Sequence, residues 1–272
     1  MFRLLTLMMG AIVAISLLVM SLIDVPVFSN TIENVPATRR PALVLLCAAS
    51  NRQVMETVVE NYMNQCDGRI ELQFGPSQAL ISGLEVTGEG DLLLPADQSY
   101  LEMAEQNGLT GRSFHVASMN VVLAVRRGNP LSIHSLRDLE RSDVRLVQAN
   151  PELAAIGKLT KERLEQFNAW RRLERVTDGF VSTVTEAANS VSAGAGDAAI
   201  VYDVVVMGNQ DLEIVTFEEL SDLRAEVNVA ITSGCKDRRR ARHFINFLTN
   251  DALGRQIYQS YGFTVPPHDE PE

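Results

Sequence analysis

Cysteine, histidine and positive charge are all scarce in this chain of 272 residues. The three cysteines, Cys47, Cys66 and Cys235, match no metal-ligand spacing, and one thiol is left over if the other two pair. The sequence therefore leaves their disulfide state open. With 24 Lys and Arg against 34 Asp and Glu, the formal net charge is −10. No basic stripe is available to neutralise phosphates, so the composition argues against a nucleic-acid partner.

The composition otherwise predicts a folded protein that begins with a targeting segment. Apolar residues make up 46% of the chain and charged residues 21%, which is ordinary for a globular protein. Arg3 precedes an apolar run, residues 4–23, of about the length that spans a bilayer. Residues 1–29 are expected to be a signal peptide or an uncleaved membrane anchor, and residues 30–41 a linker. Both outcomes predict that the rest of the chain is periplasmic or otherwise extracytoplasmic.

Two serines each follow a strand-like run and stand where a helix is expected to begin. Ser50 ends the first run, residues 42–50, and Ser77 ends the second, residues 70–77. The start of a helix leaves backbone N–H groups facing outward, with the positive end of the helix dipole behind them, and this arrangement suits an anion. Two such ends at one sheet edge would form a site for a small oxyanion. The alternative is that both serines are ordinary N-caps.

Further along the chain, strand patterns alternate with helix patterns, which predicts a mostly parallel sheet. The expected helices cover residues 51–65, 77–84, 97–107, 135–139, 151–170, 237–248 and 251–261. One more helix is expected to begin near residue 182 or 183. The expected strands include residues 70–74, 91–94, 116–125, 144–149, 198–202, 212–216 and 227–232. The pattern predicts two α/β lobes joined by two crossing segments, around a cleft that closes by hinge motion.

The chain resembles a known family, the periplasmic molybdate-binding proteins of ABC importers, within the larger group of two-lobed solute-binding proteins. The order and spacing of the similar segments carry the resemblance, which covers roughly residues 42–265. These segments are residues 48–50, 74–80, 91–97, 107–109, 120–125, 149–152 with Gly157, 200–202 and 244–248.

The resemblance implies an α/β, type II periplasmic-binding-protein fold, with two mixed sheets flanked by helices and a hinge between the lobes. Lobe I is expected to comprise residues 42–118 with 231–267, lobe II residues 119–230, and residues 268–272 a tail. It further implies a monomeric binding protein rather than an enzyme. Such a protein captures molybdate or tungstate without a metal or other cofactor and delivers it to an ABC permease.

In that family a tetrahedral dianion is held by hydroxyls and backbone N–H groups from both lobes, without a charged side chain. Carried over to this sequence, Ser50 and Ser77 would donate from the first lobe. The second lobe would offer backbone donors near Ile156 and Val184 and the hydroxyl of Tyr202. A site made only of donors favours a fully ionised oxyanion over protonated phosphate, whose proton needs an acceptor.

Two residues depart from the family's pattern. Ile156 stands before Gly157 where the family usually has a small residue, and this side chain would narrow or reshape the cavity. Asp203 follows Tyr202 directly, and a carboxylate so close to a dianion is unfavourable unless it points away. The sequence therefore does not separate molybdate from tungstate, sulfate or another oxyanion.

Two alternatives stay open at this point. Residues 75–79 resemble the G-x-S-x-G motif with its last glycine replaced, so Ser77 could be the nucleophile of a serine hydrolase. That enzyme would need a histidine base, and no histidine follows a plausible core strand; the four are His115, His134, His243 and His268. The other alternative is a membrane-anchored binding domain of the same fold, used for another anion or for sensing.

Overall fold

The computed structural model describes residues 41–66 and 68–267. The expected signal peptide or anchor, the linker up to residue 40 and the expected tail, residues 268–272, lie outside these residues. Within the part that is described, no helix is both long and apolar enough to cross a membrane.

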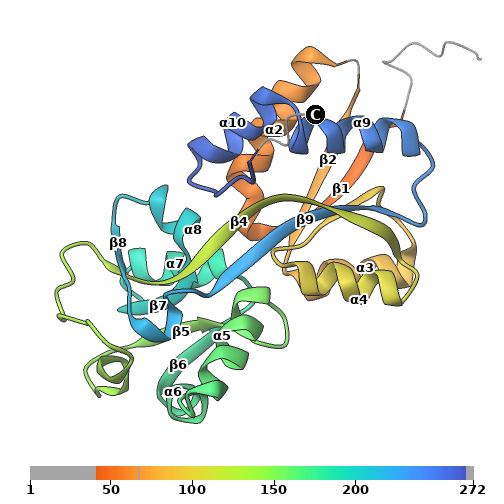
Figure 1. Cartoon of the computed structure of the whole chain (residues 1–272). Coiled ribbons are helices and arrows are strands. Elements are labelled where there is room, and N and C mark those ends of the chain that lie inside the picture. Colours follow the sequence, from red (N-terminus) through yellow and green to blue (C-terminus); the bar gives the residue numbers. More distant parts are fainter. Residues whose placement is uncertain (1–40, 67, 268–272) are drawn as a thin grey trace, which may run out of the picture. The chain divides into compact units, whose positions relative to one another are not determined.

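Strands and helices alternate along the chain (Figure 1). The first half contains β1 (Leu43–Ala48), the 3-10 turn η2 (Ala49–Asn51), α2 (Arg52–Gln65), β2 (Ile70–Gly75), α3 (Ser77–Thr87), β3 (Leu92–Leu94), α4 (Gln98–Gln106) and the long β4 (Thr110–Arg126). The next segments are η3 (Leu136–Glu140), β5 (Leu146–Ala149), α5 (Ala155–Gln166), α6 (Trp170–Val176), β6 (Thr177–Val181), α7 (Val184–Ser192), β7 (Ala198–Tyr202) and α8 (Asp203–Met207). The last are β8 (Leu212–Val215), η4 (Glu218–Leu220), β9 (Arg224–Thr232), α9 (Arg238–Thr249) and α10 (Ala252–Ser260).

The strands form a mixed sheet in the order β2-β1-β3-β9-β4-β7-β5-β6, with β8 paired to β4. β1 runs parallel to β2 and β3, whereas β9 is antiparallel to β3 and β4. Residues 110–120 of β4 pair with β9, and residues 121–126 pair with β7 and β8. β4 therefore links two groups of strands, as the expected crossing segments require. The α/β fold with mixed strand pairing is confirmed. The expectation of a mostly parallel sheet is wrong, because β4 pairs antiparallel with β7, β8 and β9, and β9 pairs antiparallel with β3. The lobe boundaries stay a prediction.

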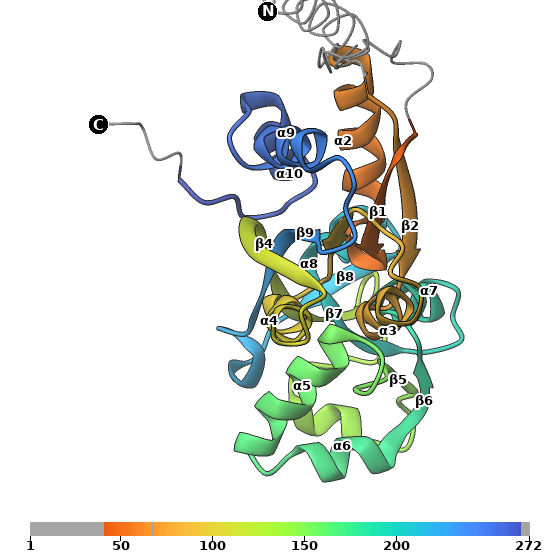
Figure 2. The same cartoon turned by 90° about the vertical axis from the view of Figure 1, so that its right-hand side faces the viewer.

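Helices cover both strand groups, so the central strands are buried. Every residue of β3 and β7 is buried, as is all of β1 except Val44. Figures 1 and 2 show α2, α9 and α10 together at one end and α5 and α6 at the other. Strands covered on both faces read as continuous apolar runs, which is the pattern the sequence shows at β1 and β7.

Three expectations about helices and strands are wrong. The long helix over residues 151–170 is two helices, α5 and α6, because Asn168 adopts a left-handed conformation (φ 53°) between them. α5 also begins four residues late, since Leu153 and Ala154 donate to the Asn150 carbonyl in a turn. β6 and α8 were not expected. β6 is a half-exposed edge strand, and the valines of α8 favour a strand by local propensity.

All three cysteines are free thiols in this structure, which answers the question that the sequence left open. Cys47 is fully buried in β1, and burial raises the pKa of its thiol. Burial also raises the pKa of Cys235 to about 11. These two thiols therefore stay protonated at neutral pH and pack as small apolar side chains.

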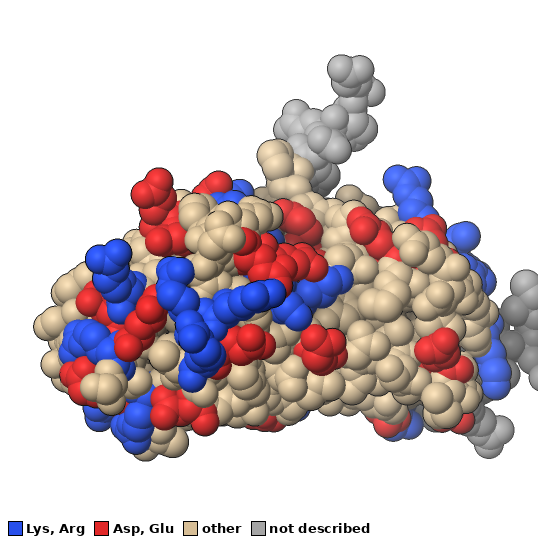
Figure 3. All heavy atoms as spheres, turned by 90° about the horizontal axis from the view of Figure 1, so that it is seen from below, with Lys and Arg blue, Asp and Glu red and all other residues tan. Residues whose placement is uncertain are grey.

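Charges of both signs are interspersed on the face seen from below (Figure 3). Exposed pairs of this kind are common on the surface; Arg141 and Asp143, for example, lie 2.7 Å apart. Exposed ion pairs contribute little to stability because water and salt screen them. The face in Figure 3 thus presents mixed charge rather than a basic surface.

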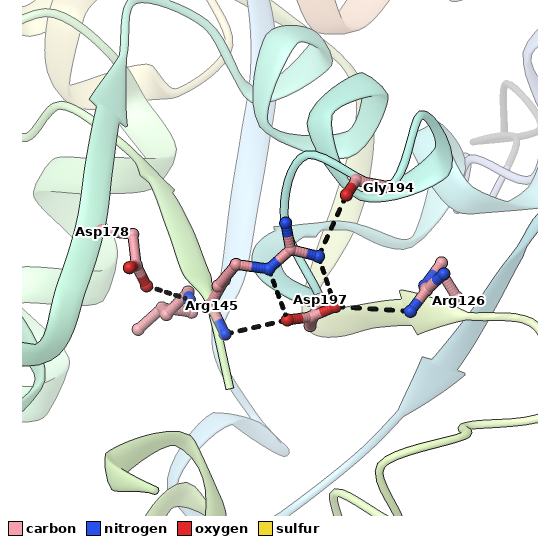
Figure 4. Close-up of polar contacts among 6 residues, drawn as sticks. Arg126, Arg145, Asp178, Gly194 and Asp197 are labelled. Carbon is pink, nitrogen blue, oxygen red and sulfur yellow. Dashed lines mark hydrogen bonds and ion pairs between the residues drawn. The ribbon is translucent and has the colours of Figure 1, made fainter. Parts of the chain in front are cut away.

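One buried carboxylate, Asp197, joins the starts of β5 and β7 to β4 (Figure 4). It accepts hydrogen bonds at 2.9 Å from Nε and Nη2 of Arg145 and at 3.0 Å from the Arg145 backbone N–H. Nη2 of Arg126 on β4 lies 3.4 Å away. The Asp197 side chain is only 6% exposed, and the hydrogen bonds from Arg145 hold the pKa of this carboxyl below its usual value. The network fixes the two strands whose far ends carry α5 and Tyr202.

We expect Asp197→Asn to lower the free energy of unfolding by roughly 2 kcal/mol at pH 7, because it removes one charged partner from a buried hydrogen-bonded cluster. The pKa of Asp197 is lower in the folded chain than in the unfolded chain. The stability that the Asp197 carboxylate contributes is therefore complete above about pH 4. It is lost as the pH falls through the pKa of Asp197 in the folded chain. Urea unfolding at pH 7 and pH 3 measures this difference.

Asp143→Asn is the matched control, because Asp143 is exposed and also pairs with an arginine. It should leave the urea midpoint nearly unchanged at pH 7. An Asp197→Asn effect of the same size at pH 3 as at pH 7 would contradict the assignment.

Candidate functional site

A small cavity, partly open to solvent, lies where several strands end and helices begin. Its empty volume, which includes the part open to solvent, is about 240 Å³. All five residues expected to bind ligand line it: Ser50, Ser77, Ile156, Val184 and Tyr202. The other lining residues are Ala48, Ala49, Gly75, Pro76, Ala96, Ala154, Ala155 and Thr183. No charged side chain is among these lining residues of the described chain, so any ligand here meets only neutral groups.

Three helical segments begin at this cavity without a side-chain cap. The residues before them, Ala48 at η2, Pro76 at α3 and Ala154 at α5, have no side chain that accepts from the helix. Three helices that do not begin with a cavity-lining residue are capped by carboxylates, namely Asp97 of α4, Asp237 of α9 and Asp251 of α10, whereas α6, which follows Ala169, is also uncapped. Since the first N–H groups of a helix lack an intrahelical partner, the uncapped starts leave donors for a ligand.

α7 also begins at the cavity, and its cap leaves donors free. The Thr183 side chain accepts from the N–H of Glu186 at 3.1 Å, the third residue of the helix. The N–H groups of Val184 and Thr185 lie before this capped position. Val184 lines the cavity from α7 as Ile156 lines it from α5, and both side chains are buried.

Neither serine is an N-cap, so that alternative from the sequence is wrong. Ser77 is the first residue of α3, and its side chain is buried. Its Oγ accepts the Ala96 N–H at 3.1 Å. A hydroxyl that accepts from a backbone N–H keeps its own proton to donate. Ser77 can therefore donate to an anion in the cavity.

Ser50 lies inside η2 and is oriented by a residue that the sequence reasoning missed, Asn51. The Asn51 side chain is fully buried, and its Nδ2 donates to Ser50 Oγ at 3.2 Å. Its Oδ1 in turn accepts from the Tyr258 hydroxyl at 3.4 Å. A chain of donors thus runs from α10 to Ser50 and leaves the serine proton free. Asn51 could have been found in the sequence as a polar residue that directly follows Ser50 at an expected helix start.

Tyr202 ends β7, and its hydroxyl has no hydrogen-bond partner within the described residues. The side chain is fully buried. Burial raises the pKa of Tyr202 well above its usual value, and the negative charge of Asp97 adds to the effect. The phenol therefore stays protonated. A buried hydroxyl without a partner is costly, so an acceptor in the cavity would relieve this cost.

Asp203 points away from the cavity, which removes the repulsion that the sequence suggested. Its carboxylate accepts the Asn120 N–H at 3.1 Å, Asn120 Nδ2 at 2.6 Å and the Val204 N–H at 2.9 Å. These bonds tie the start of α8 to β4.

Direct contacts close the cavity on two sides. The Gln78 N–H of α3 donates to the Leu153 carbonyl at 3.2 Å. On the other side, Thr185 Oγ1 donates to the Ala49 carbonyl at 3.4 Å. Each bond joins one strand group to the other beside the cavity.

The hydrolase alternative would require a base hydrogen-bonded to Ser77. Nε2 of His115 lies 2.8 Å from Glu226, and Nδ1 of His243 lies 2.9 Å from the Tyr62 hydroxyl. Neither these two nor His134 lines the cavity, and His268 lies outside the described residues. In the described chain, then, Ser77 has a backbone donor beside it rather than a histidine.

The chain belongs to the family of bacterial extracellular solute-binding proteins, whose model matches residues 43–264. It is a solute-binding protein of the ABC-transporter type, as the resemblance implied. A curated relative is the molybdate-binding protein ModA of Escherichia coli, 22% identical over 239 residues, which are 82% of this chain and 89% of the relative.

Two solved structures with the same fold extend the comparison. The periplasmic molybdate-binding protein of Azotobacter vinelandii has a TM-score of 0.70 at 16% identity, covering 83% of this chain and 100% of that one. The sulfate-binding protein SubI of Mycobacterium tuberculosis has a TM-score of 0.73 at 16% identity, covering 84% and 88%. The two-lobed periplasmic-binding-protein fold is thereby confirmed, and the named relatives are binding proteins.

Gly157 allows α5 to begin close to the end of β5. A Cβ at this position would lie 2.4 Å from the Ala149 carbonyl oxygen and 2.8 Å from two further backbone atoms. We expect Gly157→Ala to lower the free energy of unfolding by about 1–3 kcal/mol, because the helix start must shift. Urea unfolding checks this. Gly83→Ala, in the exposed middle of α3 with open space around it, should be neutral or stabilising by about 0.5–1 kcal/mol. Equal effects of the two substitutions would contradict the close approach.

Proposed function

We propose that this protein captures a tetrahedral dianion, molybdate or tungstate, outside the cytoplasm and delivers it to the permease of an ABC importer. The observation that carries the proposal is a small cavity surrounded by hydrogen-bond donors, with no charged side chain among the described residues that line it. Membership of an extracellular solute-binding family supports the location and the role.

The donors around the cavity match an ion that has only acceptors. Ser50 and Ser77 each accept a hydrogen bond from a nitrogen, so their hydroxyl protons are free for a ligand. Tyr202 offers a third hydroxyl. At neutral pH phosphate carries a proton that needs an acceptor, and none of the described residues that line the cavity offers a carboxylate. Molybdate, tungstate and sulfate carry no such proton, so the site favours them.

The helix starts supply the electrostatic attraction that a dianion needs. Each helix N-terminus carries the equivalent of roughly half a positive charge, and its free N–H groups can hydrogen-bond an oxyanion. η2, α3, α5 and α7 all begin at the cavity. Together they can stabilise a dianion without a lysine or arginine, even in a chain whose net charge is −10.

The size of the cavity supports a small inorganic ion. The empty space of about 240 Å³ includes the part open to solvent, so the room between the cavity walls is smaller still. Ile156, larger than the residue usual in the family, occupies part of the wall. Sulfate, the ligand in the name of one structural relative, is the alternative that the experiment must separate from molybdate.

Thermal unfolding of the full chain in the presence of each ion tests the proposal. An ion at about 100 times its dissociation constant adds roughly 2.7 kcal/mol, which raises the midpoint by about 5–10 °C for a domain of this size. We expect this rise with molybdate and tungstate and none with phosphate, and a larger rise with sulfate would make sulfate the ligand instead. The assignment would be contradicted if phosphate alone raised the midpoint, or if none of the ions raised it.

Tyr202→Phe distinguishes an effect on ligand affinity from an effect on stability. Because the hydroxyl has no partner among the described residues, its removal should leave the ligand-free midpoint unchanged or slightly higher. The affinity for molybdate should fall about tenfold to a hundredfold, since a hydrogen bond to a charged group contributes about 1.5–3 kcal/mol. Isothermal titration calorimetry measures this loss.

Two serine variants complete the test. Ser77→Ala should weaken binding by a similar factor, whereas Ser82→Ala, an exposed serine of the same helix, should not. If Tyr202→Phe and Ser77→Ala both bound molybdate as the unmodified chain does, the proposed site would be wrong.

A further inference from the structure

A second, larger cavity adjoins the one described above, and we refer to it as the outer chamber. It shares Ala49 and Ser50 with the inner cavity and has an empty volume of about 720 Å³, part of it open to solvent. It lies between the start of α2 and the segments around α7 and α8, with Arg52 on one side and Asn189 and Asn209 on the other.

The outer chamber has a positive charge that the inner cavity lacks. Among the described residues that line either cavity, Arg52 alone is charged. Four carboxamide side chains accompany it in the outer chamber: Gln53, Asn189, Asn209 and Gln210. Arginine and carboxamide N–H groups are all donors suited to an anion.

Arg52 is held in place at the edge of the first strand group. Its guanidinium carbon lies 4.0 Å from the centre of the Phe74 ring on β2, a cation–π contact. Nη1 also lies 3.5 Å from Oε1 of Glu56 one turn along α2, and the two side chains are 50% and 54% exposed. An ion pair this exposed is weak, so the guanidinium stays available to an approaching anion.

A dianion that approaches this protein meets an unfavourable long-range field. The chain carries a formal charge of −10, and the donors of the inner cavity act only at contact distance. A half-exposed cation at the rim of the site would raise the local concentration of the anion and speed its association.

The contact that separates the two chambers is of a kind that can open. Thr185 Oγ1 reaches the Ala49 carbonyl at 3.4 Å, a long hydrogen bond. Ala49 lines both chambers, while Thr185 lines the outer one and its neighbour Val184 the inner one. An anion in the outer chamber is therefore next to the bond that must break when the two strand groups separate.

We propose that the outer chamber is the first docking site of the tetrahedral dianion and that Arg52 attracts it there before the cleft closes. This inference rests on the proposed function, because it concerns the same ligand. Arg52 determines how fast the ion arrives. The hydroxyls and helix starts of the inner cavity determine how long it stays.

Stopped-flow measurement of molybdate binding to the full chain at low ionic strength tests the role of Arg52. Arg52→Gln should lower the association rate constant by about threefold to tenfold and leave the dissociation rate constant unchanged. The difference should fade at about 0.5 M salt, because salt screens exposed charges. Arg52→Lys should retain most of the rate.

Matched variants control for net charge. Arg239→Gln removes an exposed arginine of α9 that lines neither chamber and should change the association rate less than Arg52→Gln. Glu56→Gln, which frees Arg52 from its partner, should raise the association rate. Glu60→Gln, one turn further from the site, should raise it less.

The outcomes distinguish this inference from the proposed function. If the unmodified chain binds none of molybdate, tungstate and sulfate, the proposed function is wrong. If it binds but Arg52→Gln and Arg239→Gln slow association equally, the inference is overturned and the function stands. A change confined to the dissociation rate would also overturn it, because Arg52 would then contact the bound ion rather than attract it.

Discussion

Unfilled hydrogen-bond donors around one small cavity are the constraint on which the rest of this structure depends. The Tyr202 hydroxyl is buried and has no partner among the described residues, and three helical segments begin at the cavity without a side-chain cap. Such groups destabilise a fold unless water or a ligand satisfies them. Under the proposed function, a fully ionised oxyanion would supply the missing acceptors, and helix dipoles rather than a side chain would balance its charge. Binding and stability are therefore coupled through the same groups.

Contacts outside the cavity position these donors. β5 and β7 are fixed at their starts by Asp197 and Arg145, and at their far ends they carry α5 and Tyr202. On the other side of the cavity, Asn51 connects Ser50 to Tyr258 of α10. Asp203 is turned away by Asn120 of β4. The chemistry of the site is thus set by contacts between segments far apart in the sequence. We propose that neutral donors hold the ion and that a charge outside the cavity attracts it.

The local part of this arrangement could be predicted from the sequence. A strand followed by a serine and a helix is a short-range pattern, and the residues found in this way, Ser50 and Ser77, line the cavity. The partners of these residues could not be predicted, because Ser77 accepts from Ala96, 19 residues away, and Asp203 from Asn120, 83 residues away. Such pairs depend on strand order, which periodicity does not encode. Local propensity also misled at α8, where three valines in a row favour a strand, and at Asn168, where a left-handed residue ends a helix.

The most direct test of the central claim is calorimetric titration of the full chain with molybdate in pairs of buffers that differ in ionisation enthalpy, between about pH 6 and pH 9. We expect the dissociation constant for molybdate to stay constant over this pH range, with no proton taken up or released on binding. The ion is already fully ionised, Tyr202 stays protonated throughout, and no carboxylate or histidine of the described chain lines the cavity. Uptake of a proton on binding, or an affinity that changes about tenfold per pH unit, would contradict it. A titratable group would then take part in holding the ion, and a site built only of neutral donors would be wrong.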